Sequence, residues 1–242
     1  MTSHENVIAW LVPTARGSNA EKATHMAENF FRTVTTTSSP YLASRLSDLF
    51  SSRSRNAIQV SFDQTPKRPG RFILGTDPRS CDIILPAVAG VARQHCSLSF
   101  DSESRLVLED FSDQGTQVWY DWESVGDKTD YTWVLCCGPG TAQRITIDIQ
   151  GLRFQVILND YPERDTRAYQ DKVEAFCQQP SWADGLSSGW DRASVAPVLP
   201  LFAAEPLFRH IFVKSIGADE PRGEIYLWNI AKPWEPMVKA VA

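Results

Sequence analysis

The sequence has few histidines and few cysteines, and this scarcity limits the chemistry that it can support. Its 242 residues contain four scattered histidines, His4, His25, His95 and His210. None of the five cysteines has the spacing of a zinc ligand set, and Cys136 and Cys137 are adjacent, too close for a shared zinc corner. We therefore expect no metal and no other cofactor. Reduced, mostly structural thiols are typical of an intracellular protein, either nuclear or cytoplasmic.

Long apolar runs and an excess of positive charge are also missing. No segment approaches the roughly 18 apolar residues of a membrane-spanning helix, and residues 7–12 are too short for the apolar part of a signal peptide. The formal charge is −5 and the pI about 5.4, whereas nucleic-acid binding needs a basic face. We expect neither a membrane nor a nucleic-acid partner, and the sequence leaves the oligomeric state open.

The motifs of common hydrolases and nucleotide-binding enzymes are absent as well. The sequence has no Gly-x-Ser-x-Gly elbow, no His-Glu-x-x-His and no Walker loop. We interpret His95 as a structural hydrogen-bonding residue and Asp82 as an acceptor that organises a turn, rather than as an acid or a base.

What the sequence does contain is short segments in which apolar and polar residues alternate. This period of two, typical of half-buried strands, is clear in Ile145, Ile147 and Ile149 and recurs through most of residues 57–158. The apolar run 7–12, closed by Pro13, predicts one more strand. About ten or eleven short strands with tight turns predict an all-β sandwich.

Residues 14–56 interrupt this pattern, and we interpret them as an insertion that loops out of the sandwich. Asn19 is a candidate N-cap of a helix whose apolar residues follow at helical spacing: Ala23, Met26, Ala27, Phe30, Phe31 and Val34. The polar, basic stretch 51–55 is interpreted as a solvated loop, with a phosphorylated or localisation segment as the alternative.

Four short motifs follow one another between residues 74 and 116. They are Leu74-Gly75-Thr76, Cys81-Asp82-Ile83-Ile84-Leu85, Ala92-Arg93-Gln94-His95 and Asp110-Phe111-Ser112-Asp113-Gln114-Gly115-Thr116. In order and spacing they resemble the forkhead-associated (FHA) domain, with its Gly-Arg, Asp-Ile-x-Leu, Ser-Arg-x-His and Ser-x-Asn-Gly-Thr blocks. The resemblance implies an FHA-like β-sandwich whose loops bind a phosphothreonine peptide through charge-assisted hydrogen bonds.

The residues that hold the ligand in that family are only partly present here. The family's phosphate-binding arginine and serine are replaced by Thr76 and Ala92, and its peptide-binding asparagine is replaced by Gln114. Gly75 and His95 match as structural support. The phosphopeptide site that the resemblance implies comprises Thr76, Arg79, Ala92, Arg93, Asp113, Gln114, Gly115 and Thr116.

The two lost phosphate ligands predict a weakened pocket. Each hydrogen bond to a charged group is worth roughly 1.5–3 kcal/mol, so losing two weakens binding roughly a hundred- to ten-thousand-fold. Arg93, Arg79 or Arg71 are candidate replacement cations, although Arg93 is equally expected to pair with an acidic neighbour such as Asp82. Asp113 adds a carboxylate beside the expected phosphate.

Two functions remain open on these residues. The chain is either a phosphopeptide-binding protein or a phosphate-independent scaffold. A scaffold would be favoured by a neutral or acidic edge with an exposed aromatic patch of Trp119, Trp122 and Trp133. Either function implies a protein or phosphopeptide partner.

After Asn159 the composition changes, so we divide the chain into three parts. Residues 7–159 are the sandwich, with 14–56 as its insertion, 160–208 are a helix plus linker, and 209–242 are a strand segment. The helical face is formed by Tyr169, Val173, Phe176 and Cys177.

The last segment resembles the first three strands of a protein-kinase N-lobe, with an unrelated hairpin as the alternative. Gly217 and Gly223 correspond to the nucleotide-binding hairpin, and Lys239 to the strand lysine that pairs with ATP phosphates. The sequence stops at Ala242, before the groups that place magnesium and the acceptor in a kinase. We therefore expect no enzyme activity, and a truncated kinase that lacks its catalytic lobe is the third functional alternative.

Overall fold

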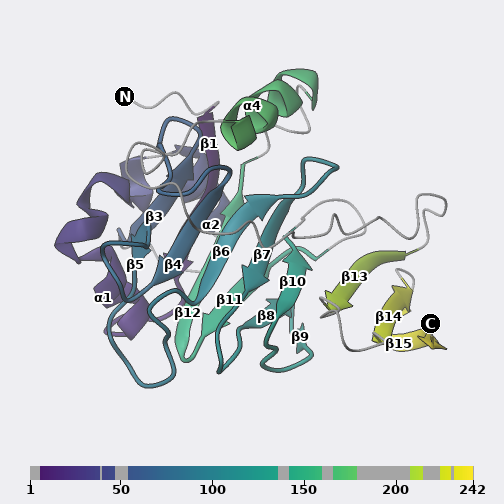
Figure 1. Ribbon diagram of the computed structural model, residues 1–242. Helices are drawn as coiled ribbons and strands as arrows, with labels where there is room; N and C mark the ends of the chain where they lie inside the picture. The colour runs from purple at the N-terminus through teal and green to yellow at the C-terminus, as the bar shows by residue number, and fades with distance from the viewer. Residues whose placement is uncertain are drawn as a thin grey trace, which may run out of the picture.

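Two β-sheets pack face to face around one apolar core (Figure 1). The computed structural model describes residues 6–38, 40–46, 54–135, 142–159 and 166–178, and also the backbone of three strands between residues 208 and 241. The all-β sandwich that the sequence predicts is confirmed, with more strands than the predicted ten or eleven.

The first sheet has seven strands in the order β2-β3-β1-β12-β11-β8-β9. They are β1 (Val7–Pro13), β2 (Thr33–Thr35), β3 (Asn56–Ser61), β8 (Gln117–Tyr120), β9 (Glu123–Ser124), β11 (Ile145–Ile149) and β12 (Leu152–Leu158). The predicted strand before Pro13 is β1, which lies between β3 and β12 and is buried along its whole length.

The second sheet follows the order β13-β10-β7-β6-β4-β5 and continues beyond β13 into β14 and β15. Its strands are β4 (Arg71–Gly75), β5 (Ile83–Ile84), β6 (Cys96–Phe100), β7 (Leu106–Asp110), β10 (Tyr131–Val134), β13 (Phe208–Lys214), β14 (Glu224–Asn229) and β15 (Lys232–Val241). Only β4 and β5 pair in parallel among the described strands.

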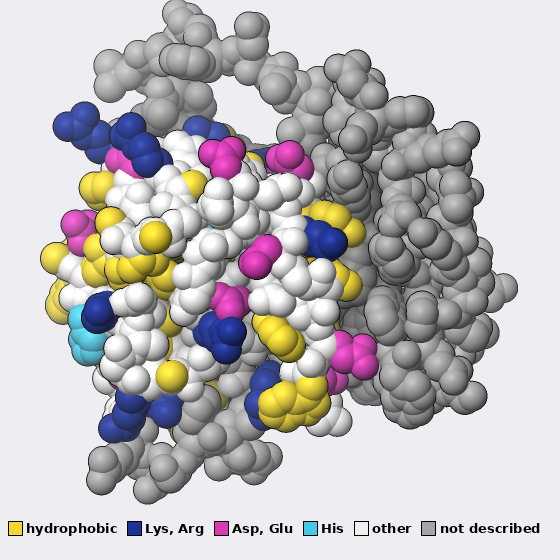
Figure 2. Space-filling model, turned by 90° about the horizontal axis from the view of Figure 1, so that it is seen from below, with side chains coloured by type: hydrophobic (Ala, Val, Ile, Leu, Met, Phe, Trp, Pro, Cys, Tyr) yellow, Lys and Arg dark blue, Asp and Glu magenta, His cyan; other side chains and the backbone are white. Residues whose placement is uncertain are grey.

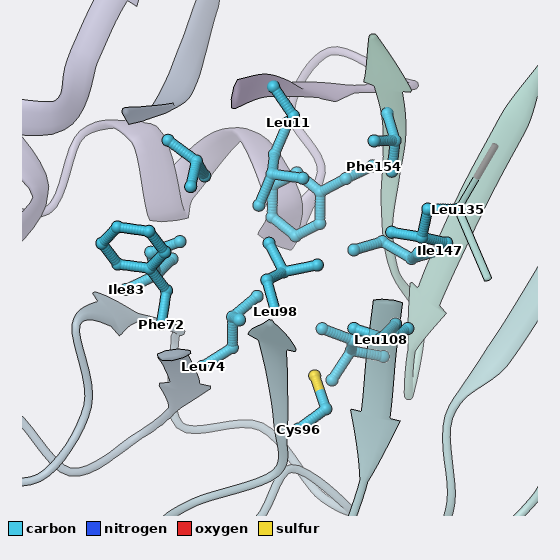
Figure 3. Packing of buried hydrophobic residues seen from close by; sticks show 14 of the residues in the cluster. Leu11, Phe72, Leu74, Ile83, Cys96, Leu98, Leu108, Leu135, Ile147 and Phe154 are labelled. Atoms are coloured by element: carbon cyan, nitrogen blue, oxygen red, sulfur yellow. The ribbon is translucent and has the colours of Figure 1, made fainter. Parts of the chain in front are cut away.

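The core lies where the inward-facing side chains of the two sheets meet. Leu11, Phe154 and Ile147 of the first sheet face Leu98 and Leu108 of the second (Figure 3). Each fully buried side chain of this kind contributes roughly 1.5–3 kcal/mol relative to an exposed one. Burial of the inward-facing side chains of both sheets therefore stabilises the sandwich.

The helical part of residues 14–56 differs from the prediction. Its elements are α1 (Asn19–Thr24), η2 (Ala27–Arg32), η3 (Thr36–Ser38) and α2 (Pro40–Leu46). The N-cap is Ser18 rather than Asn19, because the Ser18 side chain accepts a hydrogen bond from the N–H of Glu21 at 3.2 Å.

The predicted long helix ends early because a side chain competes for one of its carbonyl groups. Asn29 Nδ2 donates to the carbonyl of Ala23 at 2.8 Å, and the chain continues as the 3₁₀ helix η2. Phe30 and Phe31, predicted on the buried face of the helix, are 72% and 93% exposed. That prediction is wrong.

Residues 14–56 also do not loop out of the sandwich. Strand β2 adds an edge to the first sheet by pairing with β3, and Ala20 and Ala23 of α1 belong to the main core. Leu42 of α2 packs in a second cluster with Trp10 of β1. The described parts of this segment, residues 14–38, 40–46 and 54–56, therefore belong to the folded unit.

A helix after the sandwich, α4 (Thr166–Gln178), covers one end of the core. The predicted residues Tyr169, Val173 and Phe176 are buried, and the rings of Phe176 and Phe72 are 5.1 Å apart. Cys177, predicted on the same face, is exposed instead. None of the described helices is long and apolar enough to cross a membrane.

Candidate functional site

The residues predicted to form the phosphopeptide site lie at one end of the sandwich, which we call the loop edge. It consists of loops 76–82, 86–95 and 111–116 and the turn 150–151, low in Figure 1 and facing the viewer in Figure 2. Figure 2 shows acidic and basic side chains interspersed over this face, so the edge carries no large field of one sign.

Gly75, the last residue of β4, lets the first two loops lie close together because it has no side chain. A Cβ atom at Gly75 would lie 2.3 Å from the carbonyl oxygen of Arg93. Beyond it, the N–H of Thr76 donates to the carbonyl of Ala92, and the N–H of Asp77 donates to that of Arg93, both at 3.1 Å. The loops that contain Thr76 and Ala92 are therefore held side by side.

His95 joins the second loop to the third from inside the molecule. It is fully buried. Its Nδ1 accepts a hydrogen bond from the N–H of Ala92 at 3.1 Å, and its Nε2 lies 3.1 Å from the carbonyl oxygen of Gly115. Since Nδ1 is an acceptor, Nε2 carries the proton and donates to Gly115. This tautomer makes His95 a bridge between two loops.

The third loop is built around the carboxylate of Asp110. Its Oδ1 accepts hydrogen bonds from the hydroxyls of Ser112 and Thr116 at 2.9 and 2.7 Å. The Ser112 hydroxyl in turn accepts one from the N–H of Gly115 at 2.9 Å. Gly115 has a φ of +78°, and a Cβ there would lie 2.8 Å from the backbone of Lys128, so glycine is required.

Burial shifts the ionisation of both groups in this network. Desolvation lowers the pKa of His95, and the neighbouring Asp110 carboxylate opposes that shift. Desolvation also raises the pKa of Asp110, while hydrogen bonds from Thr116 and Ser112 oppose it. At neutral pH the network holds a neutral histidine.

The side of the loop edge where phosphate is expected offers few donors. The Thr76 hydroxyl donates to the Ala92 carbonyl at 3.4 Å, and Ala92 contributes no polar side-chain atom. Arg93 is 83% exposed at its side chain and pairs with Asp77 at 3.2 Å. Arg79 is exposed on the first loop, which also contains Thr76.

The acidic partner of Arg93 differs from the one predicted. Asp82 is buried and accepts hydrogen bonds from the N–H groups of Lys67 and Ile73 at 2.8 and 2.9 Å, as expected of a turn-organising acceptor. Asp77 takes the place beside Arg93 instead. The pKa of Asp77 is lowered, first by a hydrogen bond from the N–H of Arg79 and second by one from the Ser80 hydroxyl.

Asp77 is a site residue that the sequence reasoning missed. Its signal was the sequence Asp77-Pro78-Arg79-Ser80, because an aspartate followed by proline favours a turn in which the carboxylate accepts from the backbone two residues on. The structure shows that hydrogen bond to the N–H of Arg79 at 3.0 Å.

The other candidates are spread around the edge. Asp113 and Gln114 are exposed at the tip of the third loop, and Arg71 pairs with Glu109 at 3.0 Å, away from the loops. The exposed aromatic patch that would favour a scaffold is not formed by these three residues: Trp133 is fully buried, and Trp122 alone of the three is exposed.

The remaining predicted residues belong to the C-terminal strands. Gly217 and Gly223 lie outside the described residues, and Lys239 lies on β15 opposite Tyr226 of β14. Among the described residues, no cluster of histidine, cysteine, aspartate and glutamate side chains is suited to hold a metal ion.

Residues 72–129 match the family model of the FHA domain. The matched segment contains every loop of the edge except the turn 150–151, and it confirms the resemblance that the four motifs indicate. It spans well under half of the chain. No curated protein matches the chain.

Several solved structures are similar to this chain. Rad53 1-466 in complex with AMP-PNP has 18% identity and a TM-score of 0.33, and the match covers 59% of this chain and 32% of that one. The N-terminal FHA domain of Rad53p from S. cerevisiae, in complex with a phosphothreonine peptide, has 18% identity and a TM-score of 0.31, covering 55% and 96%. An engineered FHA with a Myc-pTBD peptide has 16% identity and a TM-score of 0.35, covering 66% and 99%. The chain thus spans about a third of the length of Rad53 1-466.

Proposed function

We propose that the loop edge recognises a phosphothreonine peptide, with weaker contacts to the phosphate than the FHA pattern provides. One observation carries the proposal: the three loops are still held together, although Thr76 and Ala92 have replaced the phosphate ligands. His95 joins the second loop to the third by hydrogen bonds, and backbone hydrogen bonds next to Gly75 join the first loop to the second. The family match over residues 72–129 supports it. A frame of this kind orders backbone groups for a ligand in advance and so lowers the entropy cost of binding.

Arg93 is the group best placed to meet the phosphate. Its guanidinium is mostly solvated, and an exposed ion pair such as Arg93–Asp77 contributes only about 0–1 kcal/mol. A phosphate that carries nearly two negative charges competes well for that guanidinium. The Thr76 hydroxyl supplies one further donor, and Gln114 faces the peptide from the third loop.

A phosphate-independent interaction is the second candidate. It is favoured by the carboxylates of Asp77 and Asp113 at the edge, because they repel phosphate. Under this alternative an unphosphorylated peptide binds as tightly as its phosphorylated twin.

The C-terminal strands are proposed as a kinase-like N-lobe segment without catalytic groups. Support comes from the order β13-β14-β15, three consecutive antiparallel strands with Lys239 on the third. We also propose the division at residues 159 and 208 as domain boundaries. Purified protein is expected to transfer no phosphate to an acceptor, because this sequence lacks the residues that hold magnesium.

The test is a binding screen with a phosphothreonine peptide library and an unphosphorylated copy of each peptide. Fluorescence anisotropy is measured at two salt concentrations. We expect binding in the high micromolar to millimolar range, present only with phosphate and weaker at high salt. Equal affinity for the two forms would favour the phosphate-independent interaction.

A further inference from the structure

The turn between β11 and β12 reaches the loop edge through one side chain, that of Gln150. Gln150 and Gly151 have φ values of +50° and +88°, as in the tight two-residue turns that join antiparallel strands. Strands β11 and β12 continue directly from this turn, paired from Ile149 and Leu152 onward. Gln150 is therefore held by the backbone of the first sheet, whereas the third loop follows β7 of the second sheet.

The amide group of Gln150 binds two successive carbonyls of the third loop. Its Nε2 donates to the carbonyl oxygen of Gln114 at 3.0 Å and to that of Gly115 at 2.9 Å. The Gly115 carbonyl also accepts from His95. One carbonyl oxygen thus receives a buried donor from the second sheet and a half-buried donor from the first, and its two lone pairs are both used.

The same side chain also contacts the second loop. A Cβ atom at Gly90 would lie 2.9 Å from Oε1 of Gln150, so the glutamine fills the space that the missing side chain of Gly90 leaves. Gln150 therefore touches two loops of the edge from outside, whereas His95 joins the same two loops from inside.

We propose that Gln150 is a positioning residue of the loop edge: it fixes the peptide units of Gln114 and Gly115 and so aims the Gln114 side chain at the peptide. This inference rests on the proposed function for the role of Gln114 in binding. Gln150 lies outside residues 72–129, the segment that matches the family model. Through Gln150 the turn between β11 and β12 contributes to peptide recognition, so residues from both sheets form the site.

The first arm of the test uses the free protein and needs no ligand. In Gln150→Met the side chain keeps its length and loses both donors, and the backbone conformation is as accessible to methionine as to glutamine. Amide hydrogen exchange of Gly115, whose N–H donates to Ser112, is expected to become at least about fivefold faster. The control is Gln143→Met, an exposed glutamine before β11, which should leave the exchange of Gly115 unchanged.

The second arm measures binding of a phosphothreonine peptide chosen from the library screen. Gln150→Met is expected to weaken binding about three- to tenfold, and the isosteric Gln150→Glu at least as much. If Gln150 acts through Gln114, Gln150→Met should add less than about twofold in a Gln114→Ala background. A merely structural role would give the same loss in both backgrounds.

The outcomes separate the two proposals. Unchanged Gly115 exchange in a folded Gln150→Met variant would overturn the positioning role, and so would additive losses with Gln114→Ala. If the parent protein binds no phosphothreonine peptide, the proposed function fails. Faster Gly115 exchange in Gln150→Met would still support the conclusion that Gln150 holds the third loop in place.

Discussion

The guanidinium of Arg93 lies 3.2 Å from the carboxylate of Asp77, so the cation best placed for a phosphate already has an anionic partner. Asp77 is itself held in place, because its Oδ1 accepts from the N–H of Arg79 and its Oδ2 from the Ser80 hydroxyl, both at 3.0 Å. A phosphopeptide must therefore draw Arg93 away from an ordered carboxylate.

Removing that carboxylate charge should strengthen phosphate binding. In Asp77→Asn the side chain keeps an oxygen that accepts from Arg79, while the negative charge is lost. We expect phosphopeptide affinity to rise about two- to fivefold, in line with the small energy of exposed ion pairs, and the gain to shrink at high salt. Calorimetry at low and high salt measures both. A gain that salt does not reduce would rule out a charge effect.

Restoring the family's phosphate ligands should have a larger effect. Thr76→Arg together with Ala92→Ser returns two charge-assisted donors, which in principle recovers about 3–6 kcal/mol of binding energy. The observed gain should be smaller while Asp113 remains, and Asp113→Ser should increase it further. Calorimetry with one phosphothreonine pool, and a thermal melt of each variant, measures the gain. A folded triple variant that binds no better than its parent would show that the loops lack the family's geometry.

The buried histidine predicts a pH dependence of stability. The pKa of His95 in the folded protein lies below its ordinary value of 6.5, so the unfolded chain binds the proton more readily. Stability from this group is present above pH 6.5 and is lost as pH falls through the folded-state pKa. The raised pKa of Asp110 acts in the opposite direction, losing stability as pH rises above 3.8.

Chemical denaturation between pH 7.5 and 5.5 measures the histidine effect. His95→Gln should be less stable at pH 7.5 and should show a smaller decline on acidification than the parent. His25→Gln, at an exposed position, is the control and should keep the parent's decline. If His95→Gln declines as steeply as the parent, His95 is not the group responsible.

Two neighbouring residues of the segment 14–56 should differ sharply in their effect on stability. Asn29 is fully buried, and its side chain donates to Ile84 O at 2.7 Å and accepts from Ile84 N–H at 2.9 Å. Asn29→Ala leaves these groups unpaired and should cost about 2–4 kcal/mol. Phe30→Ala, at a largely exposed side chain, should change stability by less than about 0.5 kcal/mol. Urea denaturation compares the two. Equal effects would show that the segment is peripheral.

Periodicity in the sequence predicted the strands well because burial on one face of a sheet imposes a period of two. The fully buried Ile145, Ile147 and Ile149 of β11 show this directly. The helix predicted from Asn19 failed because its end is set by Asn29, a residue five positions beyond Thr24 whose side chain competes for a helix carbonyl and also binds β5. No local pattern contains such a tertiary contact.

The residues that hold the loops together were likewise easier to predict than the contacts between side chains of different loops. Gly75, His95 and Gly115 occur in motifs whose spacing is readable in sequence. The pairing of Arg93 with Asp77 and the reach of Gln150 to Gln114 depend on how loops from different strands meet. These residues are far apart in the sequence, so such contacts, and the charge pairing at the loop edge, could not be predicted from the sequence alone.

The most direct test of the central claim is a ¹H–¹⁵N NMR titration of the protein with one phosphothreonine peptide and its unphosphorylated twin. We expect the phosphorylated peptide to shift the amides of Thr76, Arg93, Gln114 and Gly115 in a saturable manner, and the twin to shift none of them at the same concentrations. Shifts of equal size with both peptides, or shifts confined to residues away from the loop edge, would contradict phosphothreonine recognition at this site.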